Sequence, residues 1–446
     1  MKIVIIGAGQ IGSNLVKRLS QENHEVILID IDPQKVKKTQ ENLDIMAIHG
    51  SGSSINVLDK AGIKGADMLV AVTDKDEINI VSCMIAGRFN VATKIARIKD
   101  AEFSTSGEIL TGRDLGIDMM INPELLTATR IAALIRQANA TDLIGFFDGR
   151  IQILGLHIDE QFNFLGQPLK DVTQHFGELN FRTIAVRRRQ QTLIPTGDNC
   201  LLSGDQVFVM AETEDIPRLI DIAGLKPLHI ENVMILGGGH IGVESARLLE
   251  KDFNVKIIES SQEKSAEIAK GLNNALVICG DGTEIDLLAQ EGIVEMDAFV
   301  AVTGKDETNI ISTLMAKHLK IPRTIALVNN TDYIPITPSI GLETTVSKQM
   351  ITVNAILKYI RRGEIISIDT LQGIDAEAIE LVPKKGAKIT KKPLKDIHFP
   401  KGAIVGAVLH EETVFVPVGD SRIQAGDKTV VFALPEAIHK VEALFD

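Results

Sequence analysis

The sequence predicts an α/β protein with two Rossmann-like parallel-sheet domains, each followed by a small α+β domain. Two observations predict this class. First, short apolar segments alternate with helical patterns, which is typical of parallel sheets. Second, three motifs recur in the same order at a spacing of 230 positions. The paired motifs are GAGQIG from Gly7 and GGGHIG from Gly237, HGSGSS from His49 and CGDGTE from Cys279, and VAVTDKDEINI from Val70 and VAVTGKDETNI from Val300.

Five short segments rich in β-branched residues predict the strands of the first sheet. These segments cover residues 2–7, 25–30, 46–50, 68–73 and 94–98. Helical patterns lie between them, over residues 11–21, 33–43, 53–62 and 76–89. Because the strand segments are almost wholly apolar, we expect a parallel sheet with helices on both faces and right-handed connections.

A second, weaker repeat follows each parallel-sheet domain. The stretch PLKDV from Pro168 matches PLKDI from Pro393, and Gly-Asp turns separate short alternating strands in both copies. This pattern predicts two β-rich domains of about 80 residues each. The expected divisions are parallel-sheet domains at 1–122 and 230–348, connecting helices at 123–140 and 349–363, and β-rich domains at 141–226 and 364–446.

Two pairs of helices have apolar patterns that leave their packing open. The connecting helices are expected to be crossover or dimerisation helices, or plain surface helices that cover their own domains. The segments KDEINIVSCMIA and KDETNIISTLMA are apolar around most of their circumference. A helix of that kind needs burial on more than one side, and a neighbouring parallel-sheet domain would supply the second face.

Composition argues against several classes of function. A net charge of −12, a pI near 5.4 and the absence of Trp disfavour nucleic-acid binding. The three cysteines are far apart, which disfavours a disulfide framework or a zinc site, and Cys83 and Cys279 are expected to be buried and inert. The chain begins on an expected core strand and has no apolar run long enough to cross a bilayer. We therefore expect a cytoplasmic protein that reaches a membrane only through a partner.

The glycine-rich motifs predict two nucleotide sites. Each follows a strand and opens a helix, so that a pyrophosphate would lie over the helix N-terminus. Asp30 and Glu259 are expected at the end of the second strand of each sheet. Their carboxylates would accept hydrogen bonds from a ribose and repel a 2′-phosphate. NAD or plain adenine nucleotides are therefore favoured over NADP. The residues of the two turns are Gly7, Ala8, Gly9, Gln10, Ile11 and Gly12, and Gly237, Gly238, Gly239, His240, Ile241 and Gly242.

The two sites are similar but unequal. Thr73 and Asp74 end the fourth strand of the first copy, where the second copy has Thr303 followed by Gly304. Arg97 ends the fifth strand and is interpreted either as a phosphate ligand or as half of a structural ion pair. Leu327 is the matching residue of the second copy. We expect the two sites to differ in affinity or in ligand.

No set of catalytic residues recurs around either site. The two histidines beside the motifs are not shared, because the repeat replaces His49 by Cys279 and places Gln10 opposite His240. The sequence therefore predicts no catalytic residue and no metal site. An NAD-dependent dehydrogenase with duplicated cofactor domains is the alternative function. The basic stretch Arg187–Arg189 favours a solvated hairpin over a phosphate site.

The duplicated blocks VAVT.KDE.NI and the Gly-Asp strands resemble the TrkA family of tandem RCK (also called KTN) proteins. The resemblance covers essentially the entire chain. It implies an RCK N-terminal and an RCK C-terminal domain in each half, and assembly into a homotetrameric ring. It also implies a regulatory subunit beneath a TrkH/TrkG-like membrane potassium transporter, at the inner face of the cell membrane. Such proteins bind NAD(H) and ATP or ADP, and gate potassium uptake according to which nucleotide is bound.

The resemblance also implies which residues contact the nucleotides. These are the two glycine turns, Asp30, Glu259, Thr73, Asp74 and Arg97. This chain departs from the family pattern in HGSGSS, where relatives often have an acidic residue after the first glycine. The second copy keeps that residue as Asp281. Which site prefers NAD(H) and which prefers ATP or ADP is left open by these differences.

Overall fold

A computed structural model describes the chain except for residues 22–23, 101–110, 177–178, 190, 226–227, 331, 343, 361–364 and 371–375. The chain forms two compact units. The first contains Met1–Thr127 and Ser347–Leu357, and the second contains Ala128–Val346 and Lys358–Asp446. The domain boundaries expected at 226 and between 363 and 364 fall outside the described residues.

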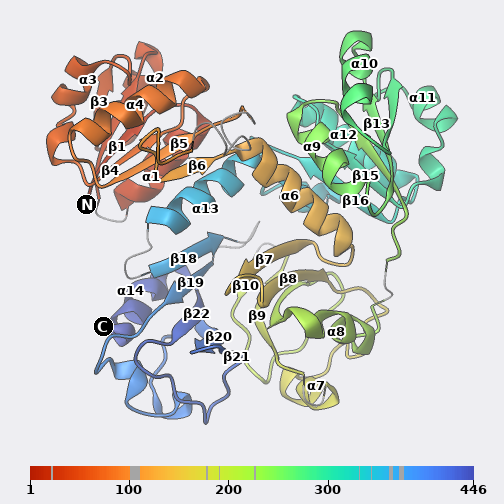
Figure 1. The fold of residues 1–446 in the computed structure, drawn as a ribbon. Helices are drawn as coiled ribbons and strands as arrows, with labels where there is room; N and C mark the ends of the chain where they lie inside the picture. The colour runs from red at the N-terminus through yellow and green to blue at the C-terminus, as the bar shows by residue number, and fades with distance from the viewer. Residues whose placement is uncertain are drawn as a thin grey trace. The chain divides into compact units, whose positions relative to one another are not determined.

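The first unit contains a six-stranded parallel sheet in the order β3-β2-β1-β4-β5-β6 (Figure 1). Its core is apolar on both faces, and buried residues of β1, β2 and β4 pack against α3 and α4 on one of them. The strands are β1 Lys2–Ile6, β2 Glu25–Asp30, β3 Met46–His49, β4 Met68–Ala71, β5 Thr93–Arg97 and β6 Met119–Ile121. The helices are α1 Gln10–Gln21, α2 Pro33–Asn42, α3 Ile55–Lys60 and α4 Asp76–Arg88.

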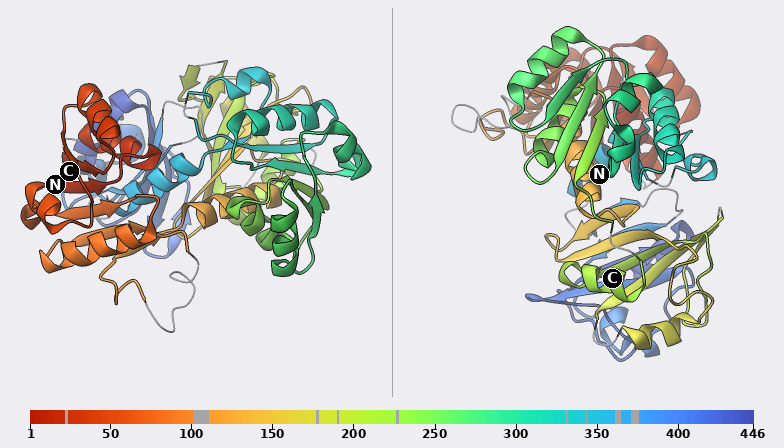
Figure 2. Two further views of the ribbon diagram at one scale, coloured as in Figure 1. Left: turned by 90° about the horizontal axis from the view of Figure 1, so that it is seen from above. Right: turned by 90° about the vertical axis from the view of Figure 1, so that its right-hand side faces the viewer.

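The second unit repeats this sheet in the order β14-β13-β12-β15-β16-β17. In the right-hand view of Figure 2, its strands (green) lie between helices. The strands are β12 Asn232–Leu236, β13 Asn254–Glu259, β14 Leu276–Cys279, β15 Ala298–Ala301, β16 Arg323–Leu327 and β17 Thr345–Val346. The helices are α9 His240–Leu249, α10 Gln262–Gly271, α11 Ile285–Gln290 and α12 Asp306–His318. The predicted α/β class with two parallel sheets is confirmed.

The second unit also contains two five-stranded antiparallel sheets, which are the predicted β-rich domains. Their orders, β10-β9-β11-β8-β7 and β18-β19-β22-β20-β21, are equivalent. The first has β7 Asp142–Phe146, β8 Ile151–His157, β9 Phe181–Arg188, β10 Gln191–Leu193 and β11 Gln206–Glu212. The second has β18 Ile365–Thr370, β19 Glu377–Leu381, β20 Ala403–His410, β21 Thr413–Phe415 and β22 Lys428–Ala433. Helices α7 Leu169–His175, α8 Ile216–Ile222 and α14 Pro435–Phe445 complete these domains.

The two β-rich domains share one apolar core. Phe146, Phe208 and Met210 of the first pack in the same buried cluster as Ala407 and Phe432 of the second. The absence of a side chain at Gly406 allows this close packing, because a Cβ there would lie 2.6 Å from the sulfur of Met210. Sheet faces that are apolar in both copies therefore bury one another.

The connecting helices α6 Pro123–Arg136 and α13 Lys348–Ile360 divide between the units. The first turn of α6 belongs to the first unit and the rest to the second, where Arg323 donates hydrogen bonds to two backbone carbonyls. The acceptors are the oxygens of Ala140, at 2.6 Å, and Leu134, at 3.3 Å. Conversely, Ser347–Leu357 joins the first unit although it follows the second parallel sheet. The connecting helices are therefore packing elements of the domains, which the sequence pattern alone left open.

Cysteine burial differs from expectation at one position. Cys83 is buried, and desolvation raises the pKa of its thiol to about 12. Cys279, however, is exposed at the end of β14, so the expectation that it is buried was wrong. Its glycine-rich neighbourhood is the loop at the carboxyl end of the sheet and not a core segment. Within the described residues, no helix is both long enough and apolar enough to span a membrane.

Candidate nucleotide-binding sites

The first glycine turn connects β1 to α1, and its three glycines have different roles. Gly7 has a φ of +106°, and a Cβ there would lie 3.0 Å from the backbone nitrogen of Thr73. A Cβ on Gly12 would lie 1.8 Å from the carbonyl oxygen of Gly7. Nothing lies within 4 Å of the place that a Cβ of Gly9 would occupy. Gly7 and Gly12 are therefore required by the fold, whereas Gly9 keeps clear the space that a pyrophosphate would use.

The second turn, between β12 and α9, repeats this geometry. Gly237 has a φ of +113°, and a Cβ on Gly242 would lie 1.9 Å from the Gly237 carbonyl oxygen. The space beside Gly239 is again open. The remaining residues of the two turns also correspond, since Ile11 and Ile241 are buried whereas Gln10 and His240 are exposed at the first helical residue. Both turns thus have the backbone geometry of a phosphate-binding loop.

A carboxylate at the end of the second strand contacts each glycine turn. The backbone nitrogen of Ala8 donates to Asp30 Oδ2 at 2.5 Å, and that of Gly238 donates to Glu259 Oε2 at 3.0 Å. The other oxygen of Asp30 accepts from the Asp32 backbone at 2.7 Å. The fold therefore holds each carboxylate against the turn, where a ribose would lie.

The two turns differ at their second residue and in the carboxylate that faces it. Asp30 faces Ala8, whereas the longer Glu259 faces Gly238. A Cβ on Gly238 would lie 2.8 Å from the Glu259 Cβ and 2.6 Å from Ile268 Cδ1. Glu259 and Ile268 together therefore leave no room for a side chain at Gly238. The two sites have different shapes beside the carboxylate.

The loops after β3 and β14 lie next to these carboxylates. The backbone nitrogens of Gly50 and Gly280 donate to the carbonyl oxygens of Asp30 and Glu259, both at 2.9 Å. In the second loop Asp281 accepts from the backbone and the hydroxyl of Thr283, and these bonds lower the pKa of its carboxyl group. Ser51 is the matching residue of the first loop.

The loop after β4 is held by an asparagine that sequence reasoning missed. Asn79, wholly buried on α4, accepts from both the backbone and the hydroxyl of Thr73 and donates to the carbonyl oxygens of Thr73 and Arg97. Asn309 makes the equivalent bonds with Thr303 and Leu327. The signal was present in the sequence, because VAVT.KDE.NI repeats the asparagine. The Thr73 hydroxyl therefore has a structural partner, and a nucleotide contact by Thr73 is still a prediction.

Asp74 is exposed, and the neighbouring Asp76 is the residue that holds the next loop. Oδ2 of Asp76 accepts from the backbone nitrogens of Lys99 and Asp100, at 2.8 and 2.9 Å. The ammonium group of Lys99 in turn donates to the Asp74 carbonyl oxygen at 2.9 Å. The loops after β4 and β5 are thus tied together, and the carboxylate of Asp74 lies at their surface.

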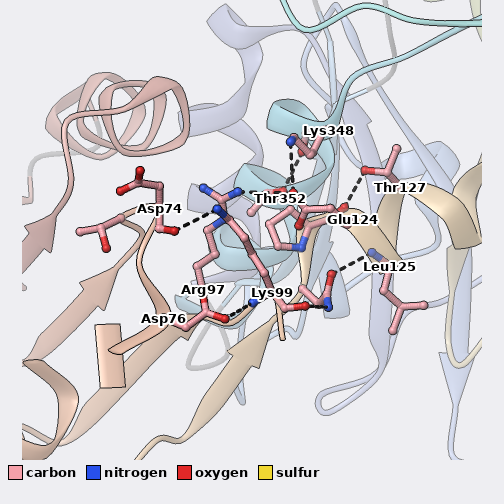
Figure 3. Close-up of polar contacts among 12 residues, drawn as sticks. Asp74, Asp76, Arg97, Lys99, Glu124, Leu125, Thr127, Lys348 and Thr352 are labelled. Carbon is pink, nitrogen blue, oxygen red and sulfur yellow. Dashed lines mark hydrogen bonds and ion pairs between the residues drawn. The ribbon is translucent and has the colours of Figure 1, made fainter. Parts of the chain in front are cut away.

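Arg97 lies in an ion-pair cluster formed with Glu124 and Lys348, which sequence reasoning also missed. Arg97 Nη2 lies 3.4 Å from Glu124 Oε1, and Lys348 Nζ lies 3.2 Å from the same oxygen. Figure 3 shows these side chains converging from β5, α6 and α13. Only 12% of the side chains of Arg97 and Glu124 is exposed. The geometry is that of the structural ion pair, and a phosphate contact by Arg97 is still a prediction.

Helix α13 also contacts the first glycine turn. The side chain of Gln349 donates to the side-chain oxygen of Gln10, and Asn14 Nδ2 lies 3.5 Å from Gln349 Oε1. Gln349 is 3% exposed. The first site therefore includes a residue of the connecting helix that follows the second parallel sheet. Nothing in the linear sequence pairs positions 10 and 349.

The TrkA-N domain family matches residues 3–123 and 233–348, and the TrkA-C domain family matches residues 158–224 and 378–446. The chain belongs to the TrkA family. Relatives in this family include the Trk system potassium uptake protein TrkA of Azorhizobium caulinodans, which is 34% identical, with 100% of this chain and 98% of that protein covered. The TrkA homolog of Archaeoglobus fulgidus is 33% identical, with both chains covered over 100% of their length.

Solved structures with RCK domains show the same fold. The crystal structure of the GsuK RCK domain matches with a TM-score of 0.62 and 19% identity, covering 100% of this chain and 94% of that one. The GsuK channel bound to NAD matches with a TM-score of 0.63 and 19% identity, covering 100% and 78%. At this identity the likeness establishes the tandem RCK fold.

We predict that Glu124→Gln destabilises the first unit by about 3 kcal/mol near neutral pH, since it leaves two cations near a neutral amide. Burial by itself would raise the pKa of Glu124, but Lys348 and Arg97 lower it below the ordinary glutamate value. The stabilisation is therefore complete above that ordinary value and is lost as the pH falls through the lower, folded-state pKa. Urea denaturation followed by circular dichroism should show the difference from wild type shrinking in acid.

The matched control is Glu41→Gln, which removes an exposed ion pair with Lys37 on α2 and should change stability by less than about 0.5 kcal/mol. Equal stability of the Glu124 and Glu41 variants at neutral pH would contradict the assignment.

Proposed function

We propose that the chain is a cytosolic nucleotide-sensing regulatory subunit that gates a membrane potassium transporter by binding NAD(H), ATP or ADP. One observation carries this proposal: full-length relatives are Trk system potassium uptake proteins, and both halves of this chain have a glycine turn with a carboxylate bonded to it. The duplicated sites would let one chain respond to two nucleotides.

The chemistry around the sites favours binding over catalysis. A dehydrogenase requires an acid or base beside the nicotinamide. His49 is directed to the Ile31 carbonyl oxygen, at 3.0 Å, and its match in the repeat is Cys279. Asn79 and Gln349, two buried polar residues beside the first site, bond to the protein, and their amides do not titrate. We therefore propose a non-enzymatic role.

The carboxylates at the ends of the second strands indicate which nucleotides would bind. Asp30 and Glu259 accept hydrogen bonds and would repel a 2′-phosphate, which favours NAD(H) and adenosine phosphates over NADP. GsuK structures bound to NAD and to ADP have been solved, and we propose the same two classes of ligand here. The proposed contacts are the two glycine turns, Asp30, Thr73, Asp74, Arg97, Glu259 and Asp281.

A regulatory ring of copies of this chain would cover exposed apolar residues that recur in the repeat. Val81 on α4 is 40% exposed and its match Ile311 on α12 is 67% exposed. Ile55 and Ile285 are also a matched pair, at 59% and 60%. Random surface positions would not keep apolar residues in both copies, and contact between neighbouring parallel-sheet domains would bury them. We propose a homotetrameric ring at the inner face of the cell membrane, bound to a TrkH/TrkG-like subunit.

We expect Asp30→Ala to weaken NAD(H) binding at the first site at least about tenfold while leaving the second site unchanged, because each carboxylate serves one turn. Calorimetry of wild type and of the matched Glu259→Ala variant should show the loss of one binding event in each variant.

Equal weakening of both binding events by Asp30→Ala would argue against independent sites. Steady, substrate-dependent consumption of NADH, followed by near-ultraviolet absorbance, would favour the dehydrogenase instead.

Assembly gives a second prediction. Replacing Val81 and Ile311 by Glu should split the ring into smaller species, because a charge would be buried in each apolar contact. Light scattering coupled to size-exclusion chromatography measures the mass. Glu77→Lys, at an exposed position on the same helix α4, is the control for altered charge. Wild-type mass for the double variant would exclude this surface from the ring contacts.

A further inference from the structure

The second β-rich domain carries a basic segment that the proposed function does not use. Residues 384–401, between β19 and β20, contain seven lysines and one aspartate, although the whole chain has a net charge of −12. Two of these lysines form ion pairs, Lys384 with Asp446 at 2.7 Å and Lys395 with Asp420. All seven are exposed, and they are Lys384, Lys385, Lys388, Lys391, Lys392, Lys395 and Lys401.

The core of the domain fixes the backbone of this segment. Ala387 and Ile389 are 1% and 0% exposed and belong to the same apolar cluster as Val405 of β20. Further along, the backbone nitrogen of Lys395 donates to the carbonyl oxygen of Gly419 at 2.8 Å. The segment is therefore anchored by its apolar residues and by backbone hydrogen bonds, and its lysines are presented outward from a fixed base.

Lys388 and Lys391 lie on one side of a short 3₁₀ helix, Lys388–Thr390. The backbone nitrogen of Lys391 donates to the carbonyl oxygen of Lys388 at 3.3 Å, which closes this turn. Residues three apart in a 3₁₀ helix lie one above the other. Because Ile389 between them is buried, both ammonium groups are directed away from the core. Together with the exposed neighbours Lys385 and Lys392, these residues form what we call the lysine face.

The first β-rich domain has the same backbone in this region. Pro168 and Pro393 are separated by 225 positions, and the same spacing applies back to the strands β8 and β19. In the first domain the backbone nitrogen of Gly204 donates to the carbonyl oxygen of Ile158 at 2.8 Å. The matching bond of the second domain joins the Gly426 nitrogen to the Pro383 oxygen at 3.3 Å. The two segments can therefore be compared residue by residue.

This comparison separates what the fold requires from what it does not. Phe164 is buried in the first domain at the position of Ile389, so the apolar anchor is kept. The exposed positions differ in charge, since the first domain has Glu160, Asn163 and Gln167 where the second has Lys385, Lys388 and Lys392. Folding alone does not explain the lysine face.

The basic stretch of the first domain, Arg187–Arg189, is arranged differently. Arg188 donates two hydrogen bonds to buried Asp205, at 2.9 and 2.7 Å. Arg187 is 8% exposed, and Arg189 is exposed in the β9–β10 turn with a φ of +59°. The hairpin predicted there is present. Its arginines do not form a continuous exposed surface comparable with the lysine face.

We propose that the lysine face binds the anionic headgroups of a phospholipid membrane. The segment 384–401 contains no arginine, which is the basic residue that interfaces between proteins favour, whereas lysine is depleted from them. Lysine is a flexible point charge that imposes no fixed geometry on its partner. Fluid headgroups require none, and each lysine beside an anionic surface strengthens binding about fivefold.

The negative charge of the whole chain does not prevent this contact. At physiological ionic strength, charges more than about 8 Å away from the membrane are largely screened, whereas lysines that touch the headgroups are not. The proposal rests on the proposed place of the chain at the inner face of a membrane, which brings lipid within reach. It adds a direct, peripheral lipid contact to the contact with the transporter.

The test is sedimentation of the full chain with vesicles, in the absence of transporter and nucleotide. Wild type should bind vesicles of phosphatidylcholine mixed with phosphatidylglycerol, should not bind vesicles of phosphatidylcholine alone, and should be released by salt. The variant Lys385→Glu, Lys388→Asn and Lys392→Gln copies the first domain. It should weaken binding to the mixed vesicles at least about tenfold.

The matched control is Lys35→Glu, Lys37→Gln and Lys38→Gln, which makes the same change of charge at exposed positions of α2. This control should bind the mixed vesicles as wild type does. Circular dichroism should show that both variants unfold as wild type does, and NADH binding by the lysine-face variant should stay at the wild-type level.

Three results would overturn the proposal: no binding of wild type to the mixed vesicles, equal binding by wild type and the lysine-face variant, or an equal loss in the α2 control. Capture of wild type by double-stranded DNA but not by the mixed vesicles would assign the face to nucleic acid instead. Because the assay contains neither transporter nor nucleotide, its failure would leave the nucleotide dependence of potassium flux intact. Loss of that dependence would likewise leave the lipid result standing.

Discussion

The carboxylate of Glu124 is the group on which the arrangement of the first unit depends. Its Oε1 accepts contacts from Arg97 at the end of β5 and from Lys348 at the start of α13. Those residues belong to the first parallel sheet and to the helix that follows the second sheet. A charge that is nearly buried is costly unless it is paired, so the cluster fixes α13 against the first domain. In this position of α13, the side chain of Gln349 contacts Gln10 of the glycine turn.

This arrangement gives the duplicated fold a physical route for coupling. A ligand changes conformational populations only through different affinities for the alternative conformations. A nucleotide at the first turn would lie beside Gln10, whose partner Gln349 belongs to the helix that leads to the second β-rich domain. We therefore propose that occupation of the first site affects the position of α13. The second site has Leu327 where the first has Arg97, so the ion pair of Arg97 has no counterpart at that position.

Much of the fold could be predicted from the sequence, because the patterns that indicate helices and strands are local. Buried parallel strands are continuous apolar segments, and the predicted strand at 25–30 is the observed β2. Because the motifs repeat, the prediction of the first parallel sheet also predicted the second. Local patterns failed where burial depends on tertiary position, as for Cys279, which ends an edge strand of its sheet.

The candidate sites were predictable to different degrees. The glycine turns and Asp30 could be singled out as candidates because a backbone that approaches a phosphate closely is built from few sequence patterns. Asn79 and Asn309 were readable from their repetition and were overlooked. The contacts of Lys348 and Gln349 could not be predicted, because their partners lie more than 200 positions away in the chain. The apolar pattern of one helix is also compatible with many packing arrangements.

The most direct test of the regulatory account is potassium flux through a TrkH/TrkG-like transporter reconstituted with this chain, measured with and without NADH and ATP. The account predicts that flux in the presence of the wild-type chain changes with the nucleotide supplied. It also predicts that a chain carrying both Asp30→Ala and Glu259→Ala binds the transporter but gives the same flux with and without nucleotide. Flux that is unaffected by nucleotide with the wild-type chain, while that chain is bound to the transporter, would contradict it.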